Sequence, residues 1–135
     1  MTQQDVQGVR SEAAASAIGL GSYALDCHFV NYLATTDGVR IEGGMFVGTK
    51  PYPVPYGAIL PKEDECSNLL VPVCMSASHV AYSSLRMEPV YMVLGQSAAI
   101  AAVLSLRERC IPQEISYEKL RESLLENGQI LEYGK

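Results

Sequence analysis

The feature that most constrains this sequence is a long run without charge, from Val90 to Leu106. Alanines fill much of the run, and three polar residues interrupt it, Gln96, Ser97 and Ser105. Its length is at the lower limit for a helix that spans a membrane. Its composition favours instead a helix of a water-soluble protein, buried on most of its sides. The sequence therefore predicts a helix from about Pro89 to Arg109 that other parts of a core must cover.

Prolines, a serine and a glycine mark the ends of two helices near the C-terminus. Pro89 suits a first helical turn, where a backbone N–H has no partner within the helix, and Pro112 lies just beyond the expected end. Ser116 is a good N-cap for a second helix, which should end before Gly128. This second helix is amphipathic, with apolar positions at Leu120, Leu124 and Leu125.

Composition narrows the class of protein. The chain has 135 residues, 48% of them hydrophobic and 19% charged, which fits one globular domain or part of a larger one. Its net charge of -5 comes without a basic stripe, so we expect neither nucleic acid nor a membrane as a partner. The N-terminus lacks the features of a signal peptide, and the compartment stays open between cytoplasm and periplasm.

The cysteines do not form a metal-binding pattern. The chain has four, Cys27, Cys66, Cys74 and Cys110, and none belongs to a C-x-x-C pair. We interpret them as mostly buried free thiols and expect no metal site.

Shorter elements are expected in the first half of the chain. Residues 3–18 have high helix propensity and predict a helix that ends at Gly19. Residues 23–30 predict a strand, in which Asp26 and His28 point to the same face. A carboxylate beside an imidazole stabilises the protonated ring, so the two residues could handle a proton together.

A hairpin and a proline-rich segment follow. Residues 39–42 and 45–48 have the pattern of two strands around Gly43-Gly44, which is typical of a hairpin. Residues 51–56 carry prolines at alternate positions, which impose an extended course. This segment either presents its two tyrosines from a stiff backbone or serves as a connection between domains.

A short apolar run comes before the long helix. Residues 68–74 predict a buried strand, and a loop of small polar residues, 76–85, follows it. In α/β proteins, ligands bind beyond the carboxyl end of such a strand, near the positive N-terminus of the next helix. With Arg86 just ahead of the helix, this place favours an anion. The alternative is a capped helix with a purely structural role.

Several stretches together resemble one family. The run NLLVPVCMSASHVAYSSLRMEPVYMVLGQSAAIAA, Asn68 to Ala102, is similar to the C-terminal segment of an FAD-dependent oxidoreductase family. In that family an N-L-L-V strand, a C-x-S-A-S/T-H loop and an R-M-x-P-x-x-M-x-x-G-x-x-A helix close the flavin site. Three further stretches are also similar, GLGSYALDCH (Gly19 to His28), PYPVPYGAILPK (Pro51 to Lys62) and SYEKLRESLLENGQIL (Ser116 to Leu131). Members often carry the label xanthan lyase, which these motifs do not explain.

The resemblance implies that a part of the family fold is missing. The family begins with a dinucleotide-binding fold that carries G-x-G-x-x-G, but Gly19-Leu20-Gly21 here lacks the third glycine. We therefore expect the C-terminal part of a larger flavoenzyme, α/β as a whole and α+β as an isolated chain. FAD would be bound by the complete protein and not by this chain alone. The expected parts are a helical remnant (1–18), a strand and hairpin part on the substrate side (19–67) and a strand–helix–helix part of the FAD-binding domain (68–135).

The resemblance also implies site residues. Arg86, Met87 and Pro89 would face the pyrimidine end of the flavin, with Ser76 and Ser78 in the adjoining loop. Gly95 would let the long helix approach a neighbouring sheet closely. The predicted catalytic residues, given at this point as hypotheses, are His28, His79 and Arg86.

Three functions remain open. The first is hydride transfer to FAD from a small substrate, for which a sugar is one candidate. The second is β-elimination from a uronate by a polysaccharide lyase, which needs a base, an acid and a group that neutralises the carboxylate, roles that Tyr23, His28 and Arg86 could take. The third is a non-catalytic interaction domain. In each case the long apolar helix lacks cover, so we expect the isolated chain to form a two-fold homodimer.

Overall fold

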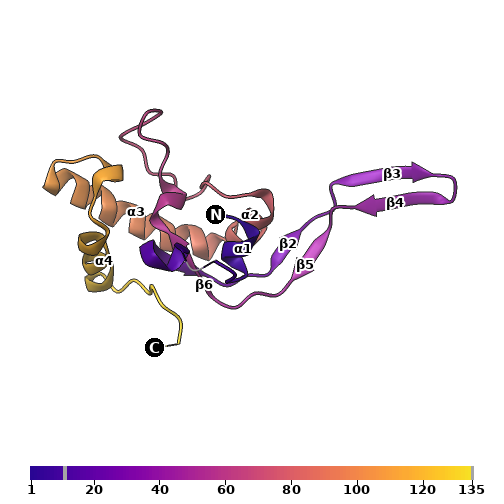
Figure 1. Ribbon diagram of the computed structural model, residues 1–135, viewed down its shortest axis with the longest axis horizontal. Helices are drawn as coiled ribbons and strands as arrows, with labels where there is room; N and C mark the ends of the chain where they lie inside the picture. The colour runs from indigo at the N-terminus through magenta and orange to yellow at the C-terminus, as the bar shows by residue number, and fades with distance from the viewer. Residues whose placement is uncertain (11, 135) are drawn as a thin grey trace.

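The chain folds into a body, made of helices and a short sheet, from which a long β-hairpin projects as an arm (Figure 1). The computed structural model describes residues 1–10 and 12–134. Its elements, with the 3-10 helices written η, are α1 (Gln3–Val6), η1 (Glu12–Ser16), β1 (Ala17–Gly21), β2 (Leu25–Cys27), β3 (Asn31–Thr35), β4 (Gly38–Glu42), β5 (Met45–Val47), β6 (Tyr52–Pro55), η2 (Tyr56–Ile59), α2 (His79–Leu85), α3 (Glu88–Glu108), η3 (Pro112–Glu114) and α4 (Tyr117–Glu126). Small antiparallel sheets and separate helices confirm the expected α+β class.

The body is built on the antiparallel pair β1 and β6, against which α3 packs. The register sets Gly21 opposite Tyr52, whose ring lies over the space that a Cβ at Gly21 would fill. Gly19 allows the close approach of α3, because a Cβ there would lie 2.3 Å from Cγ1 of Val93. This role was expected for Gly95, but a Cβ at Gly95 would meet nothing within 4 Å. Gly95 does not face β1, so its expected role is wrong within this chain.

α3 is the central helix of the body and is buried along one side. It begins and ends close to the predicted bounds, with Pro89 in its first turn and Arg109 at the C-cap in the left-handed conformation. The buried side packs against β1, α4 and η3. The other side leaves three large apolar side chains exposed, Met92, Val103 and Leu106. The body therefore covers one face of this helix and not most of its sides.

α3 is also long and apolar enough to cross a membrane. No other helix among the described residues meets this criterion. A core helix of a soluble protein has the same properties, so this is weak evidence. The contacts of α3 with β1 and α4 support its interpretation as a core helix.

α4 closes one end of the body. It begins after Ser116 and ends before Gly128, as predicted. Its apolar face is buried through Leu120 and Leu124. The hydroxyl of Tyr117 donates a hydrogen bond of 2.9 Å to the backbone oxygen of Ala17, which ties the helix to β1.

The arm consists of two ladders, one after the other. β2 pairs with β5 near the body, and β3 pairs with β4 beyond it. Residues 39–42 and most of 45–48 are strands as predicted, but they lie on the same side of the arm and do not pair. The predicted hairpin is therefore wrong. Gly43, at φ 87°, and Gly44 connect the two ladders, and the chain reverses after Thr35 instead.

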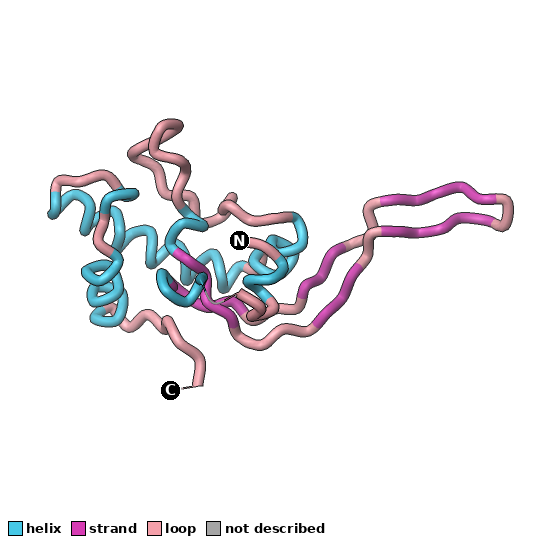
Figure 2. Tube along the Cα trace, viewed as in Figure 1, coloured by secondary structure: helices cyan, strands magenta, loops and turns pink. Residues whose placement is uncertain are grey.

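The N-terminal helix and the buried strand are the other corrections to the fold. Residues 3–18 form only α1 and η1 among the described residues, and Ala17 already belongs to β1. The pairing of β1 with β6 and its packing against α3 outweigh the helix propensity of these residues. Residues 68–74 form no strand: no neighbouring strand offers them a ladder, and Pro72 lacks an N–H. Figure 2 shows them in the long loop before α2.

The proline-rich segment is an edge strand followed by a 3-10 turn. Residues 52–55 form β6, which has one strand partner. Tyr52 and Tyr56 are both buried, 2% and 7% exposed, and the hydroxyl of Tyr56 donates to the backbone oxygen of Pro112 at 2.9 Å. The segment therefore directs its tyrosines into the core.

Candidate functional site

Four polar side chains meet where the arm joins the body. Arg86 is the C-cap residue of α2, and its Nη2 lies 3.2 Å from the backbone oxygen of Asp26 and 3.4 Å from Asp26 Oδ2. The same nitrogen is 3.3 Å from Nε2 of His28, which lies 3.8 Å from Asp26 Oδ2. The hydroxyl of Tyr23 donates to Asp26 Oδ2 at 3.2 Å. We call these four residues the arm-base cluster.

The arm-base cluster places an accessible imidazole beside a carboxylate and a guanidinium. The side chain of His28 is 75% exposed, whereas those of Arg86 and Asp26 are 34% and 24% exposed. A guanidinium only donates hydrogen bonds, so the Nε2 that faces it acts as an acceptor, and the proton of the neutral ring is on Nδ1. A proton taken up at Nε2 would create an imidazolium next to the carboxylate of Asp26. The cluster can therefore accept a proton from a bound molecule.

Buried hydroxyl groups fix the start of the arm against α2. Ser84 in α2 donates to the backbone oxygen of Tyr23 and lies 2.6 Å from the hydroxyl of Tyr52. Thr49 donates to the same carbonyl oxygen at 2.9 Å. Burial raises the pKa of Tyr52 to about 12, although its hydrogen bond with Ser84 acts in the opposite direction. The phenol is therefore neutral and holds Ser84, which in turn holds the backbone of the arm.

An open cleft of about 640 Å³ lies beside the cluster on the arm. Asp26 and His28 contribute its polar part. Three exposed aromatic side chains contribute its apolar part, Phe29, Tyr32 and Phe46. Gly44 gives the ring of Phe29 its place, because a Cβ at Gly44 would lie 2.3 Å from Cε1 of that ring. The cleft thus combines aromatic surfaces with groups that can bind hydroxyls.

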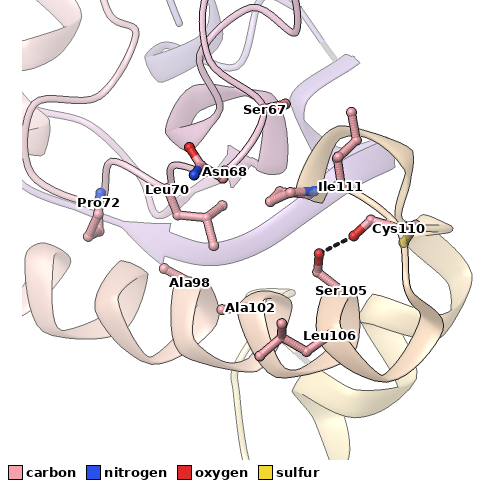
Figure 3. A pocket seen from close by; sticks show the side chains of 11 residues that line it. Ser67, Asn68, Leu70, Pro72, Ala98, Ala102, Ser105, Leu106, Cys110 and Ile111 are labelled. Atoms are coloured by element: carbon pink, nitrogen blue, oxygen red, sulfur yellow. Dashed lines mark hydrogen bonds between the residues drawn. The ribbon is translucent and has the colours of Figure 1, made fainter.

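A second cleft, of about 550 Å³, lies between α3 and the loop that precedes α2 (Figure 3). Its lining includes Leu70 and Pro72 from the loop and Ala98, Ala102 and Leu106 from α3. Ser105 donates to the backbone oxygen of Cys110 at one end. No Asp, Glu, His, Lys or Arg lines this cleft, so it offers no group for acid–base chemistry. The arm-base cluster is the stronger candidate.

The structure brings two of the three predicted catalytic residues together. His28 and Arg86 belong to the arm-base cluster, although 58 positions separate them in the chain. His79 is the exposed first residue of α2, and its side chain makes no hydrogen bond or ion pair with any residue that the structure describes. The catalytic role of all three stays a prediction.

The predicted loop residues lie around the start of α2. The loop expected over 76–85 is wrong in its second part, which forms α2. Ser78 caps this helix, and its hydroxyl accepts a hydrogen bond of 3.3 Å from the backbone N–H of Ala81. Ser76 is exposed, and its backbone N–H donates to the backbone oxygen of Ala58 at 2.7 Å. A role of either serine in cofactor binding remains a prediction.

The N-terminus of α3 has donors that fit the pyrimidine end of a flavin. Met87 is the N-cap residue and Pro89 lies in the first turn. The backbone N–H groups of Met87 and Glu88 donate to no acceptor in the described part of the chain. Such donors suit a ring edge rich in oxygen that gains negative charge on reduction. Arg86 directly precedes them in the chain, and its guanidinium contacts Asp26 and His28. The sequence contains no G-x-G-x-x-G for the pyrophosphate.

The cysteines and acidic residues build no metal site in the part of the chain that the structure describes. No group of three His, Cys, Asp or Glu side chains comes together there. The four cysteines are free, but only Cys27 is buried and Cys74 is exposed. The expectation of mostly buried thiols is therefore wrong.

Sequence reasoning missed the residues that hold the cluster in place. Ser84 was assigned to a loop, and Thr49 and Tyr52 were not connected with Asp26. The available signal was Ser78, a good N-cap ahead of the expected helix start near Pro89, which would have indicated α2. No local pattern shows that the hydroxyl of Ser84 is bound to a carbonyl 61 positions away.

Comparison with known proteins identifies the family. No curated protein and no solved structure matches the chain. A family model described as FAD dependent oxidoreductase matches residues 1–124, which is most of the chain. The match agrees with the resemblance. The chain belongs to the FAD-dependent oxidoreductase family.

Proposed function

We propose that this chain is the C-terminal part of an FAD-dependent oxidoreductase and that its arm-base cluster binds the substrate beside the flavin. The observation that carries the proposal is the contact of Arg86 with Asp26 and His28. Arg86 directly precedes the donors at the start of α3. A molecule held by the cluster would therefore lie next to those donors.

In the proposed reaction, His28 holds the proton of a substrate hydroxyl. Its side chain is exposed, so a hydroxyl can reach it. The one lone pair of Nε2 accepts from Arg86 in the structure, so the substrate hydroxyl would replace Arg86 at this nitrogen. Asp26 stabilises the imidazolium that results, and Arg86 keeps the carboxylate in place through its backbone and side-chain contacts. Removal of this proton prepares the substrate carbon to lose a hydride.

The flavin would be held at its pyrimidine end by Arg86, Met87 and the first turn of α3, which contains Pro89. When bound, FAD supplies the acceptor for the hydride. The positive end of α3 and the guanidinium favour the negative charge of the reduced ring.

The cleft beside the cluster supports a sugar as the substrate. Sugar rings have apolar C–H faces and many hydroxyls, and the cleft offers the rings of Phe29, Tyr32 and Phe46 as well as Asp26 and His28. Asp26 can accept hydrogen bonds from the sugar hydroxyls, and the aromatic rings can cover the apolar C–H face of the sugar ring. The substrate class of this proposal is therefore a polyhydroxylated ring.

Two uncovered regions support a missing dinucleotide-binding half. Residues 68–74 are apolar but have no strand partner, and Leu69 and Val73 are 48% and 44% exposed. The outer side of α3 exposes Met92 and Leu106. A further sheet beside these residues would cover both, and would supply the phosphate-binding turn that the sequence lacks.

The test is the reductive half-reaction of the longer protein encoded with its upstream region. We expect it to bind FAD, and we expect sugars to bleach its flavin absorbance without oxygen, while the 135-residue chain purifies colourless. Arg86→Ala should slow bleaching about a hundredfold, with little change in the free energy of unfolding. Arg107→Ala, which changes an exposed arginine of α3, is the control.

Two results would contradict the proposal. The first is a longer protein that binds no flavin, because the proposal requires FAD as its cofactor. A bleaching rate within about twofold of the unchanged protein in Arg86→Ala would make Arg86 a structural residue.

A polysaccharide lyase is the second candidate, because Tyr23, His28 and Arg86 lie in one cluster. Elimination from a uronate needs an acid, a base and a cation for the carboxylate, and these side chains supply all three. Release of unsaturated uronate products, without bleaching of a flavin, would favour this function. That mechanism gives no role to the free backbone N–H groups at the start of α3.

A further inference from the structure

The outer ladder of the arm has one face that is entirely apolar. Residues directly opposite in a ladder share a face, so Tyr32 lies with Ile41, and Ala34 lies with Val39. Tyr32 and Val39 are each 68% exposed, and Ile41 is 46% exposed. These four residues form a surface that we call the arm face.

The opposite face of the same ladder is mostly polar. It contains Asn31, Leu33 and Thr35 from β3 and the ion pair of Arg40 with Glu42 from β4. The alternation therefore produces an amphipathic two-stranded ribbon. A two-stranded hairpin is at best marginally stable in water and needs a partner for its apolar face. The body does not supply this partner, since all residues of β3 and β4 other than Glu42 are exposed.

We propose that the arm face packs against the arm face of a second copy of this chain, related by a two-fold axis. The chain has a net charge of -5, so most of its surface repels another copy. The arm face has no charged side chain, and a two-fold contact there brings no like charges together. Arg40 and Glu42 point to the other side and satisfy each other within one chain.

Charge also argues against pairing of the two arms edge to edge along β4. Arg40 is the central residue of β4, so two antiparallel copies of this strand that paired along their full length would place Arg40 opposite Arg40. Packing of the faces avoids that repulsion. Two apolar ribbons can interdigitate at the spacing of about 10 Å that is usual for stacked sheets.

The size of the arm face predicts a weak dimer. The exposed parts of its side chains amount to about 300–400 Å² per copy, less than the roughly 800 Å² per partner of a standard interface. We therefore expect a reversible dimer in the micromolar range or weaker. This dimer does not depend on flavin binding in the proposed function, in which the outer side of α3 belongs to the missing half. Tyr32 belongs to both the arm face and the proposed sugar cleft, so the dimer and a bound sugar would compete for its ring.

The test is sedimentation velocity of the 135-residue chain from micromolar to hundreds of micromolar concentration. We expect the unchanged chain to shift from monomer to dimer. Val39→Lys and Ile41→Lys should each weaken the dimer about a hundredfold, because two-fold symmetry places each change in the contact twice. Neither residue lines the cleft beside the arm-base cluster.

Two further variants keep the test decisive if a lysine melts the arm. Val39→Thr keeps the branched shape and should weaken the dimer about tenfold. Leu33→Lys lies on the opposite face of the same ladder and should leave the dimer within about twofold of the unchanged chain. Circular dichroism of each variant reports whether the body stays folded.

Three outcomes would overturn the proposal. A monomer at every concentration means that the arm face needs no partner of this kind. A dimer that survives Val39→Lys and Ile41→Lys but is lost in Val103→Lys lies on α3. If Leu33→Lys weakens the dimer as strongly as Val39→Lys does, then the contact is not confined to the arm face. None of these measurements involves flavin or turnover, so they leave the proposed function untouched.

Discussion

The body and the arm contain similar apolar residues but differ in what covers them. In the body, Ile18, Leu94 and Leu120 are fully buried, because β1, α3 and α4 enclose them from different parts of the chain. In the arm, Tyr32 and Val39 remain 68% exposed. Apolar character alone therefore does not bury a side chain. A second element must reach it, and in the outer ladder of the arm β3 and β4 pair only with each other.

The comparison also locates the candidate site. Arg86 belongs to the body, whereas Asp26 lies in β2 of the arm and His28 directly follows that strand. The site thus forms at the one place where the two regions meet. Its geometry depends on the body for rigidity and on the arm for its exposed imidazole and its aromatic cleft.

The largest expected effect concerns the buried side of α3. Leu94→Ala should lower the free energy of unfolding by about 3–4 kcal/mol, because it leaves a cavity beside β1. Leu106→Ala in the same helix should change it by less than about 0.5 kcal/mol, since that side chain is 80% exposed. Urea denaturation measures both. Equal effects of the two changes would mean that α3 is covered on both sides in solution.

The next effect concerns the contact between β1 and α3. Gly19→Ala should cost about 1–3 kcal/mol, because its Cβ would collide with Val93 and push α3 away from β1. Gly95→Ala should instead stabilise the chain by up to about 1 kcal/mol, since the helix gains propensity and the methyl group meets open space. Thermal unfolding of the pair distinguishes them. A destabilised Gly95→Ala would show that a surface lies against this side of the helix.

A smaller effect is expected from the hydroxyl network that anchors the arm. Tyr52→Phe should lower the free energy of unfolding by about 1 kcal/mol through loss of the bond with Ser84. It should also change the response to alkali. Burial raises the pKa of Tyr52 and of Tyr56 to about 12, above the 10.0 of an unperturbed phenol.

The sign of that response follows from which state loses its proton first. Between pH 10 and pH 12 the phenols of Tyr52 and Tyr56 ionise in the unfolded chain, whereas burial keeps both neutral in the folded chain. Stability that is fully present below pH 10 should therefore fall as the pH rises, and less steeply in Tyr52→Phe. Denaturation at a series of pH values measures the slope. Tyr133→Phe, which removes the hydroxyl of an exposed tyrosine, is the control variant.

The smallest effect is expected from removal of the outer arm. Replacement of residues 31–42 by an Asn-Gly turn should change the free energy of unfolding of the body by less than about 1 kcal/mol, because the outer ladder is exposed on both faces. Calorimetry at low protein concentration checks this. A loss of several kcal/mol would mean that arm and body unfold as one unit.

The sequence predicted those parts of the fold that depend on local signals. α3 and α4 begin and end where Pro89, Ser116 and Gly128 indicated. Capping and helix breaking act within a few residues, so they are visible in one sequence. The strands of the arm were also expected, but their pairing was not, because register depends on which strand lies opposite.

The errors come from interactions between distant segments. Alanine-rich residues before Gly19 favoured a helix, yet β1 forms because β6 offers it a ladder and α3 covers it. Residues 68–74 have the composition of a strand but no partner. In the site, Asp26 and His28 could be paired from their spacing, whereas their contact with Arg86 depends on how α2 meets the arm.

The hydrogen bonds of Ser84 have a mechanical consequence. Ser84 in α2 and Thr49, which follows β5, both donate hydrogen bonds to the carbonyl oxygen of Tyr23. The arm is therefore fixed where it joins the body. Any rotation of the arm about this point displaces each residue in proportion to its distance from the pivot. β2, which His28 directly follows, lies close to the body, and β4, which contains Val39, lies far from it (Figure 1). A partner that pulls on the tip would therefore swing the outer ladder widely while the distance between His28 and Arg86 changes little.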